Sequence, residues 1–360
     1  APVDSAPLAR EVDTGAIEAG AFRAIVGGRR VLKLRTLSVN EATIYRTCPE
    51  LYELGYVADG TGYESTGKNF SFTFGTHWHN GQEAWWLGRK DGWNEDECMS
   101  SAYRAFDHPK PDERGNVPPP LDAFDRARIR ALFALYHMLY WNDGLTPTEV
   151  EYKFVAPLLS PKGGQSANWD GLDGRIDLLA KNRRGEDLVI EHKTTGLSID
   201  DDSDYWDRVK FDMQISQYIE GATHAGFPVR GLVYDVARKP HASLKANKPE
   251  AGESPDAFQA RLFRALAEEP KKYMRRKLIV RTVSEMTAAR RDTWATARQI
   301  AMSHRENLWP RHATSCSRYG HRCEFFNVCA GEEDVRTSPN FRPKIRPTEQ
   351  GTTPKEIATV

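Results

Sequence analysis

The stretch that most constrains this chain is residues 187–195, "DLVIEHKTT", which reads as a buried strand carrying two charges. Successive strand side chains point to opposite faces, so Glu191 and Lys193 share one face while Ile190 and His192 share the other. On an edge strand such an ion pair is common and contributes little to stability. In a central strand, burying two charges is costly unless other groups or a metal engage them. The place of this strand in the sheet therefore decides how the pair is interpreted.

The order of elements around the pair predicts that this strand is central. A long amphipathic helix is expected first and is followed by three strands, a second helix and a further strand. These segments are residues 121–141, 149–159, 174–181, 188–195, 209–226 and 229–240. The pattern predicts an α/β fold, with a mixed β-sheet flanked by helices and preceded by a helical segment.

Composition limits the class of protein. The 360 residues are 39% hydrophobic and 28% charged, enough for a sizeable core. No apolar run approaches a bilayer span and the first residues lack the apolar core of a signal peptide, so we expect a cytoplasmic protein without a membrane partner. Fifty basic against fifty acidic residues argue against an indiscriminate polyanion binder. A local basic stretch, residues 271–281, is either a solvated face or a phosphate contact.

The expected organisation is a single domain with two extensions. Residues 1–34 should form a loosely ordered arm and residues 333–360 a disordered tail, rich in Pro, Thr and charge. Between them lies one domain, residues 35–332. Its three parts are a helical part at 35–143, a core at 144–240, and C-terminal helices with a cysteine segment at 241–332.

A hairpin brings a second carboxylate to the charged strand. In "GRIDLLAKNRRGEDLVIEHK", Asp177 on the first strand can lie across from Glu191 on the second, beside Lys193. Two carboxylates with open coordination positions suit Mg²⁺ or Mn²⁺, because hard cations prefer oxygen ligands and keep waters that a phosphate can replace. Lys193 would then face the phosphate.

These residues resemble the PD-(D/E)xK nuclease superfamily, with "GRID" at its Pro–Asp step and "EHK" as its E-x-K. The chain is similar to the RecB-type branch, which includes phage and CRISPR-associated exonucleases and carries a Gly-x-x-x-His and a Gln-x-x-x-Tyr helix. The segment "GTHWH" selects His79, four residues after Gly75, and "QISQY" supplies Gln214 and Tyr218. Ordinary helix packing is the alternative for each motif alone.

The resemblance implies a restriction-endonuclease-like sheet and a role for each residue. His79, Asp177, Glu191 and the backbone carbonyl of His192 would hold one or two Mg²⁺ or Mn²⁺ ions. Lys193 would position the attacking water or stabilise developing charge. Supporting positions are Gln214 and Tyr218, with Glu83 and Glu151 as weaker candidates.

Cysteine placement matches the same branch. Cys316, Cys323 and Cys329 lie within "CSRYGHRCEFFNVC", and Cys48 ends a predicted helix far upstream. The resemblance implies that these four hold a 4Fe–4S cluster, making the C-terminal part an iron–sulfur segment. Thiolates also favour zinc, which is the alternative. Cys98 matches nothing in the pattern and is expected to be a lone thiol.

The expected activity is metal-dependent hydrolysis of DNA, by an exonuclease acting on free ends in recombination or repair and of phage origin. DNA is the expected partner, together with a recombination or single-strand annealing protein, and Lys239 is a candidate DNA contact. Two alternatives remain open on the sequence alone. The chain could be a catalytically silent protein that binds DNA ends, or a metal-stabilised interaction module.

Overall fold

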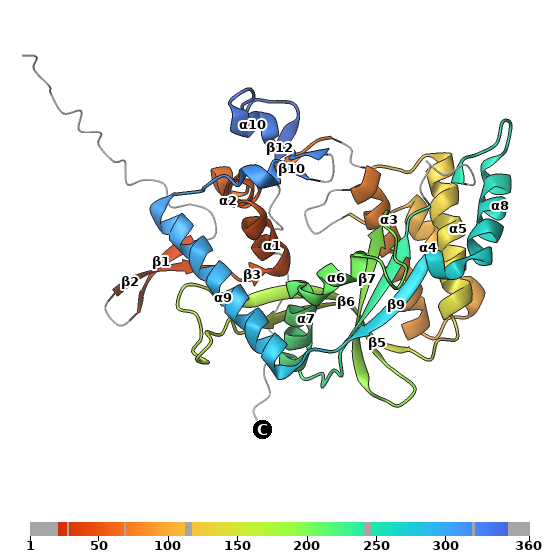
Figure 1. Ribbon diagram of the computed structural model, residues 1–360, viewed down its shortest axis with the longest axis horizontal. Coiled ribbons are helices and arrows are strands. Elements are labelled where there is room, and N and C mark those ends of the chain that lie inside the picture. Colours follow the sequence, from red (N-terminus) through yellow and green to blue (C-terminus); the bar gives the residue numbers. More distant parts are fainter. Residues whose placement is uncertain are drawn as a thin grey trace, which may run out of the picture.

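The structure is a computed structural model that describes residues 21–26, 29–67, 70–111, 117–240, 247–318 and 321–344 (Figure 1). Its helices are α1 (Val39–Thr47), α2 (Pro49–Tyr52), α3 (Phe70–Lys90), α4 (Glu95–Asp107), α5 (Ala123–Tyr140), α6 (Tyr205–Lys210), α7 (Met213–His224), α8 (Pro255–Glu268), α9 (Val283–Glu306) and α10 (Phe326–Ala330). A π-helical turn covers Glu53–Val57, and 3-10 turns cover Ala58–Gly60, Pro270–Lys272 and Ala313–Ser315. None of the described helices is long and apolar enough to cross a membrane.

A six-stranded mixed sheet forms the centre of the molecule. It contains β3 (Leu37–Ser38), β5 (Thr146–Ala156), β6 (Leu172–Lys181), β7 (Asp187–Thr195), β8 (Leu232–Arg238) and β9 (Met274–Ile279). The strand order is β3-β6-β7-β8-β9, and β5 pairs with β6. β7 is antiparallel to β6 and parallel to β8, so the charged strand is internal, as predicted.

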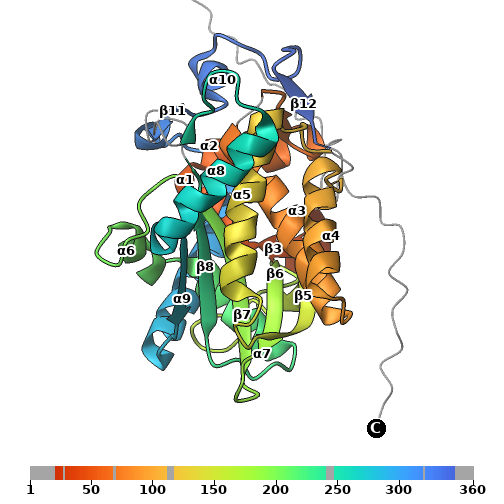
Figure 2. The same ribbon diagram turned by 90° about the vertical axis from the view of Figure 1, so that its right-hand side faces the viewer.

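Helices cover both faces of this sheet (Figures 1 and 2). Alternate residues of β7 enter two cores, because side chains alternate along a strand. Ile190 packs with the aromatic side chains of α3, α4 and α5 and with α8. Val189 packs on the opposite side with α7, through residues such as Ile215. The predicted mixed sheet flanked by helices is therefore confirmed.

α3 is longer than the sequence suggests. The alternating "FSFTF" at residues 70–74 predicts an extended segment before a helix from about Thr76, whereas one helix runs from Phe70 to Lys90. Phe74, Trp78 and Trp85 lie at helical spacing and are all buried in the core shared with α5. Tertiary packing of these aromatic side chains outweighs the local β-like pattern.

The described parts of the predicted arm and tail are more regular than expected. In the arm, β1 (Ala21–Val26) and β2 (Arg29–Leu34) pair antiparallel and do not form a loose segment. β12 (Phe341–Pro343) pairs with β4 (Tyr63–Ser65), so the predicted disorder from residue 333 is wrong up to 344. Phe341 is buried and stacks on Phe325, which stabilises this contact. The rest of the predicted arm and tail, 1–20 and 345–360, lies outside the described residues.

The C-terminal segment returns to the N-terminal helices. α9 runs beside α1, where the Tyr45 and Ser303 hydroxyls are 2.8 Å apart. The segment continues through β10 (Ser317–Arg318), β11 (His321–Arg322) and α10. The segment that carries Cys316, Cys323 and Cys329 thereby reaches the end of α1, where the His312 N–H donates to Cys48 Sγ over 3.4 Å.

Candidate active site

Asp177 and Glu191 lie on neighbouring strands at the centre of the sheet. The antiparallel pairing of these strands runs from Lys181–Asp187 to Leu178–Ile190, so Asp177 and Glu191 are the next residue on each strand. The backbone N–H of His192 donates a hydrogen bond to Asp177 Oδ2 over 2.8 Å. The exposed fraction of the side chain is 14% for Asp177 and 2% for Glu191. The two carboxylates predicted from the hairpin are therefore brought together in a largely buried place.

Lys193 joins these carboxylates to α7. Its ammonium contacts Glu191 Oε1 directly and donates to Gln214 Oε1 over 2.8 Å. The amide of Gln214 donates in turn to the Tyr218 hydroxyl over 2.9 Å. α7 starts at its cap, Asp212, whose side chain accepts from the Gln214 backbone N–H. The structure thus connects the Gln-x-x-x-Tyr pair to Lys193, and the predicted supporting role stays a prediction.

His79 reaches the same spot from α3. Its Nδ1 is 3.7 Å from Asp177 Oδ2, and 37% of its side chain is exposed. His77 instead lies buried, with its ring nitrogens 3.1 Å and 3.0 Å from the carbonyls of Phe106 and Pro119. Burial lowers the pKa of His79, and Asp177 opposes this. The neutral imidazole favoured near pH 7 is the form that binds metals.

Glu151 belongs to the same acidic group, more strongly than the sequence suggests. It lies on β5 beside β6 with φ of 52°, a left-handed conformation that is strained for a non-glycine residue. Burial, followed by the charges of Asp177, Glu83 and Glu191, raises the pKa of Glu151 to about 9. Arg175 pairs with Glu151 at 3.2 Å, and Lys110 pairs with Glu83 at 2.8 Å. Glu151 therefore lies close enough to the acidic group to interact with Asp177 and Glu191, in a strained backbone conformation.

The charges of the site are unbalanced. Burial and, after it, the charge of Asp177 raise the pKa of Glu191 to about 8, although Lys193 opposes them. Burial would lower the pKa of Lys193, but Glu191 and Asp177 together raise it above its ordinary value. The charges contribute to both shifts, because two carboxylates lie close to one ammonium. An additional positive charge beside these carboxylates would favour their ionised forms.

A divalent cation fits this imbalance. Glu191 Oε2 is buried and has no hydrogen-bond partner among the described residues. In the described part of the chain, no group of three or more His, Cys, Asp or Glu side chains is arranged to hold a metal ion. Mg²⁺ needs no such cage, because it typically uses one or two carboxylates and keeps waters or substrate oxygens as its other ligands. The donor set of Asp177 and Glu191 matches that requirement.

The pKa of Glu191 leads to a test by unfolding. Between its ordinary 4.5 and about 8 the folded protein holds a proton that the unfolded chain has lost. Metal-free stability contributed by this group is therefore lost as pH rises through that window. We expect Glu191→Gln, which cannot ionise, to gain melting temperature over wild type as pH rises from about 5 to about 8.5 with chelator present. A constant difference across this range would contradict the raised pKa.

The cysteines form a second group near the chain ends. The backbone N–H of His312 donates to Cys48 Sγ over 3.4 Å, and the Cys323 N–H donates to the Cys316 carbonyl over 2.8 Å. Burial raises the pKa of Cys323, and Cys316 and Cys48 raise it further. Burial, followed by Glu50, Cys323 and Cys48, raises the pKa of Cys329 to about 11. All four are free thiols, a soft donor set that suits iron or zinc, although the described residues are not arranged around a metal.

Cys98 lies elsewhere, fully buried in α4, so the structure separates it from this group as expected.

The predicted basic stretch, residues 271–281, is largely engaged by partners within the protein. Arg275 and Lys277 pair with Asp201 at 2.8 Å and 3.3 Å, and Arg276 points into the core. Lys239 Nζ lies 5.7 Å from the centre of the Phe74 ring, at the start of α3. Its contact with DNA stays a prediction.

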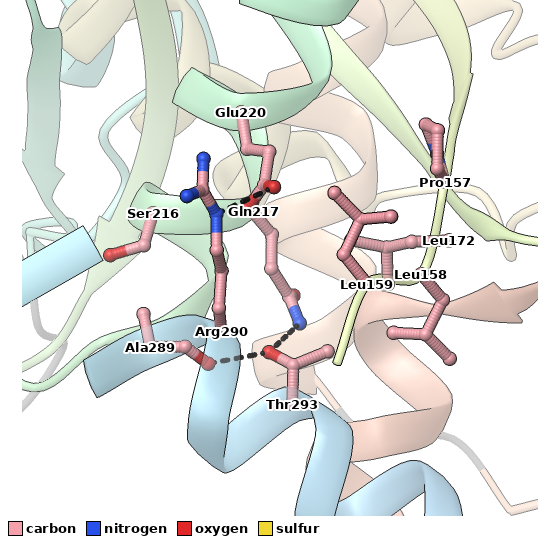
Figure 3. A pocket seen from close by; sticks show the side chains of 10 residues that line it. All are labelled: Pro157, Leu158, Leu159, Leu172, Ser216, Gln217, Glu220, Ala289, Arg290 and Thr293. Atoms are coloured by element: carbon pink, nitrogen blue, oxygen red, sulfur yellow. Dashed lines mark hydrogen bonds and ion pairs between the residues drawn. The ribbon is translucent and has the colours of Figure 1, made fainter. Parts of the chain in front are cut away.

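A small cavity between α7 and α9 is a poor candidate for a ligand site (Figure 3). Its volume is about 10 Å³, no more than a single water needs. Gln217 donates to Thr293 over 3.0 Å, and Arg290 pairs with Glu220 at 2.8 Å across it. Gln217 points away from Lys193, whereas Gln214 on the same helix contacts it. The cavity is a packing defect between helices.

Comparison with known proteins gives a family match over most of the chain. A model of the PD-(D/E)XK nuclease superfamily matches residues 36–330. No curated protein sequence matches significantly. Among solved structures, a protein named SSO0001 is similar at 16% identity and a TM-score of 0.29, over 56% of this chain and 68% of its own. A "Putative exonuclease" from Eubacterium rectale is similar at 11% identity and a TM-score of 0.39, over 83% of this chain and 89% of its own.

Proposed function

Because the chain belongs to the PD-(D/E)XK nuclease superfamily, we propose that it is a Mg²⁺- or Mn²⁺-dependent deoxyribonuclease that hydrolyses phosphodiester bonds. The observation that carries this proposal is the pairing of Asp177 with Glu191, beside Lys193, in the middle of the sheet. Unbalanced carboxylates there can take a divalent cation, and the Lys193 ammonium contacts Glu191 directly.

Each residue has a distinct part in the proposed reaction. Asp177 and Glu191 would hold the cation, with neutral His79 and the carbonyl of His192 as further donors. When bound, the cation lowers the pKa of a water and offsets charge on the scissile phosphate. Lys193, kept protonated by Glu191 and Asp177, stabilises negative charge that develops on the phosphate. Gln214 fixes the lysine's direction, and Tyr218 fixes the amide of Gln214.

We further propose that the protein is an exonuclease of the RecB-type branch, acting on DNA ends in recombination or repair in the cytoplasm. Support comes from the Gly-x-x-x-His and Gln-x-x-x-Tyr motifs, whose His79, Gln214 and Tyr218 all reach the carboxylate site. The proposal extends to a 4Fe–4S cluster on Cys48, Cys316, Cys323 and Cys329, which are neighbours across the two ends of the fold. A recombination or single-strand annealing protein is the proposed partner.

The direct test compares DNA with and without ends. Anaerobically purified protein is incubated with Mn²⁺ and with linear or covalently closed circular DNA, each single- or double-stranded. We expect loss of linear DNA while circles of the same strandedness survive. Cleavage of circular DNA would show that the protein is an endonuclease and not an exonuclease. DNA that is bound at its ends yet never cut would instead favour a catalytically silent end-binding protein.

A further inference from the structure

A buried charged row lies on the face of the sheet opposite the carboxylate site. The strand register places His192 of β7 beside Asp235 of β8, and Asp235 beside Arg276 of β9. His192 Nδ1 is 3.1 Å from Asp235 Oδ2, which lies 3.0 Å from Arg276 Nε. His192 and Asp235 are 2% and 3% exposed. The three side chains form one continuous row across three adjacent strands.

Aromatic side chains of α3 and α5 fix this row in place. The Tyr136 hydroxyl donates to Asp235 Oδ2 over 3.0 Å and accepts from Arg276 over 2.7 Å. The Trp86 ring lies nearly parallel to the His192 ring, at 21° and with centres 6.3 Å apart. Tyr140 lies under the Arg276 guanidinium, 3.6 Å from ring centre to carbon. Each polar side chain of the row is therefore held from at least two sides.

Burying such a row is expensive for stability alone. Buried ion pairs can often be replaced by well-packed apolar residues with no loss of stability, so their presence calls for a further reason. His192 Nε2 is buried without a hydrogen-bond partner among the described residues, so Nδ1 carries the ring's polar contact. Asp235 thereby fixes the orientation of the His192 ring.

His192 connects the row to the active site through its main chain. Its backbone N–H donates to Asp177 Oδ2 over 2.8 Å, and its chain neighbours are Glu191 and Lys193. A rotation of the backbone at His192 would move Asp177, Glu191 and Lys193, the three groups that the proposed chemistry uses. We propose that Asp235 and Arg276 are positioning residues, which hold the His192 side chain on one face so that its backbone holds Asp177 on the other. This inference rests on the proposed nuclease function.

A double-mutant cycle tests the coupling. His192→Leu removes the ring's hydrogen bond, and Asp235→Asn removes the charge that receives it. We expect each to lower kcat about 10- to 100-fold with little change in KM for DNA, and to weaken Mn²⁺ binding measured by calorimetry without DNA. If Asp235 acts through His192, the double variant should lose no more than the larger single loss. His192→Asn, whose amide can replace the Nδ1 donor, should recover most of the rate.

Asp107→Asn is the matched control, because Asp107 forms a partly buried pair with Arg130 at 2.6 Å on helices away from the site. It should keep kcat and Mn²⁺ affinity. Additive losses in the double variant would overturn the inference, as would variants that lose melting temperature but keep wild-type kcat and Mn²⁺ affinity per folded molecule. If the wild type cuts DNA and the variants keep its kcat and Mn²⁺ affinity, this inference is refuted while the proposed function stands. A wild-type protein that neither cuts DNA nor binds Mn²⁺ would refute the proposed function and this inference together.

Discussion

Lys193→Met should leave a folded protein that has lost DNA cleavage by about 10²- to 10³-fold or more. Methionine keeps the length of the side chain but removes the ammonium that contacts Glu191 and Gln214. The fold should survive, because Glu191 can take up a proton when its partner is lost; its pKa is already raised to about 8. Cleavage rate and melting temperature, measured on one preparation, separate the two effects.

Lys181→Met is the control for this substitution. Lys181 lies on the same hairpin and pairs with Asp187 at 2.7 Å, and 46% of its side chain is exposed. Its loss should change neither cleavage nor stability by much, since exposed pairs contribute about 0–1 kcal/mol. Wild-type cleavage by Lys193→Met would remove Lys193 from the mechanism.

Cys316→Ser should give a colourless protein with little iron and a lower melting temperature. The cluster proposed on the four cysteines would tie α1 to the C-terminal segment, and a metal bound only by the folded chain adds its binding energy to stability. Without it, that contact rests on hydrogen bonds such as that from Ser315 to the Thr47 carbonyl, 2.8 Å long. Iron content, the visible spectrum and thermal unfolding of anaerobic protein measure the effect.

Cys98→Ala is the control, since Cys98 is also a free thiol but lies fully buried in α4, among residues that pack on α3, whereas Cys316 is only partly buried. It should keep the iron and the colour of the wild type. Unchanged iron in Cys316→Ser would contradict the cluster. If the wild type contains zinc and no iron, the four cysteines still form a metal site, but the proposed 4Fe–4S cluster is refuted.

Much of the carboxylate site can be predicted from the sequence because its residues are close together in the chain. Alternation along 187–195 fixes which side chains share a face, and a short hairpin turn fixes the register as far as Leu178–Ile190, the pair next to Asp177 and Glu191. Motif spacing selects His79, and the structure gives His77 a separate buried place. Local geometry therefore accounts for the core of the site.

Other parts depend on contacts between distant residues. The β4–β12 pairing joins Ser65 to Phe341, and no local pattern marks Phe341–Pro343 as a strand. His192 and Asp235 are 43 residues apart, and their contact requires the strand order of the finished sheet. The left-handed conformation of Glu151 is likewise invisible in the sequence, so this residue appeared weaker than the structure shows. Such features follow from tertiary packing and not from local preference.

The account depends most on Asp177, and one measurement tests it directly. Cleavage of end-labelled linear DNA is followed with Mn²⁺ for wild type, Asp177→Ala and Asp187→Ala, the last removing a carboxylate from the surface pair on the same hairpin. We expect cleavage by wild type and Asp187→Ala that chelator abolishes, and none by Asp177→Ala. Equal cleavage by wild type and Asp177→Ala would show that the chemistry lies elsewhere and would contradict the central claim.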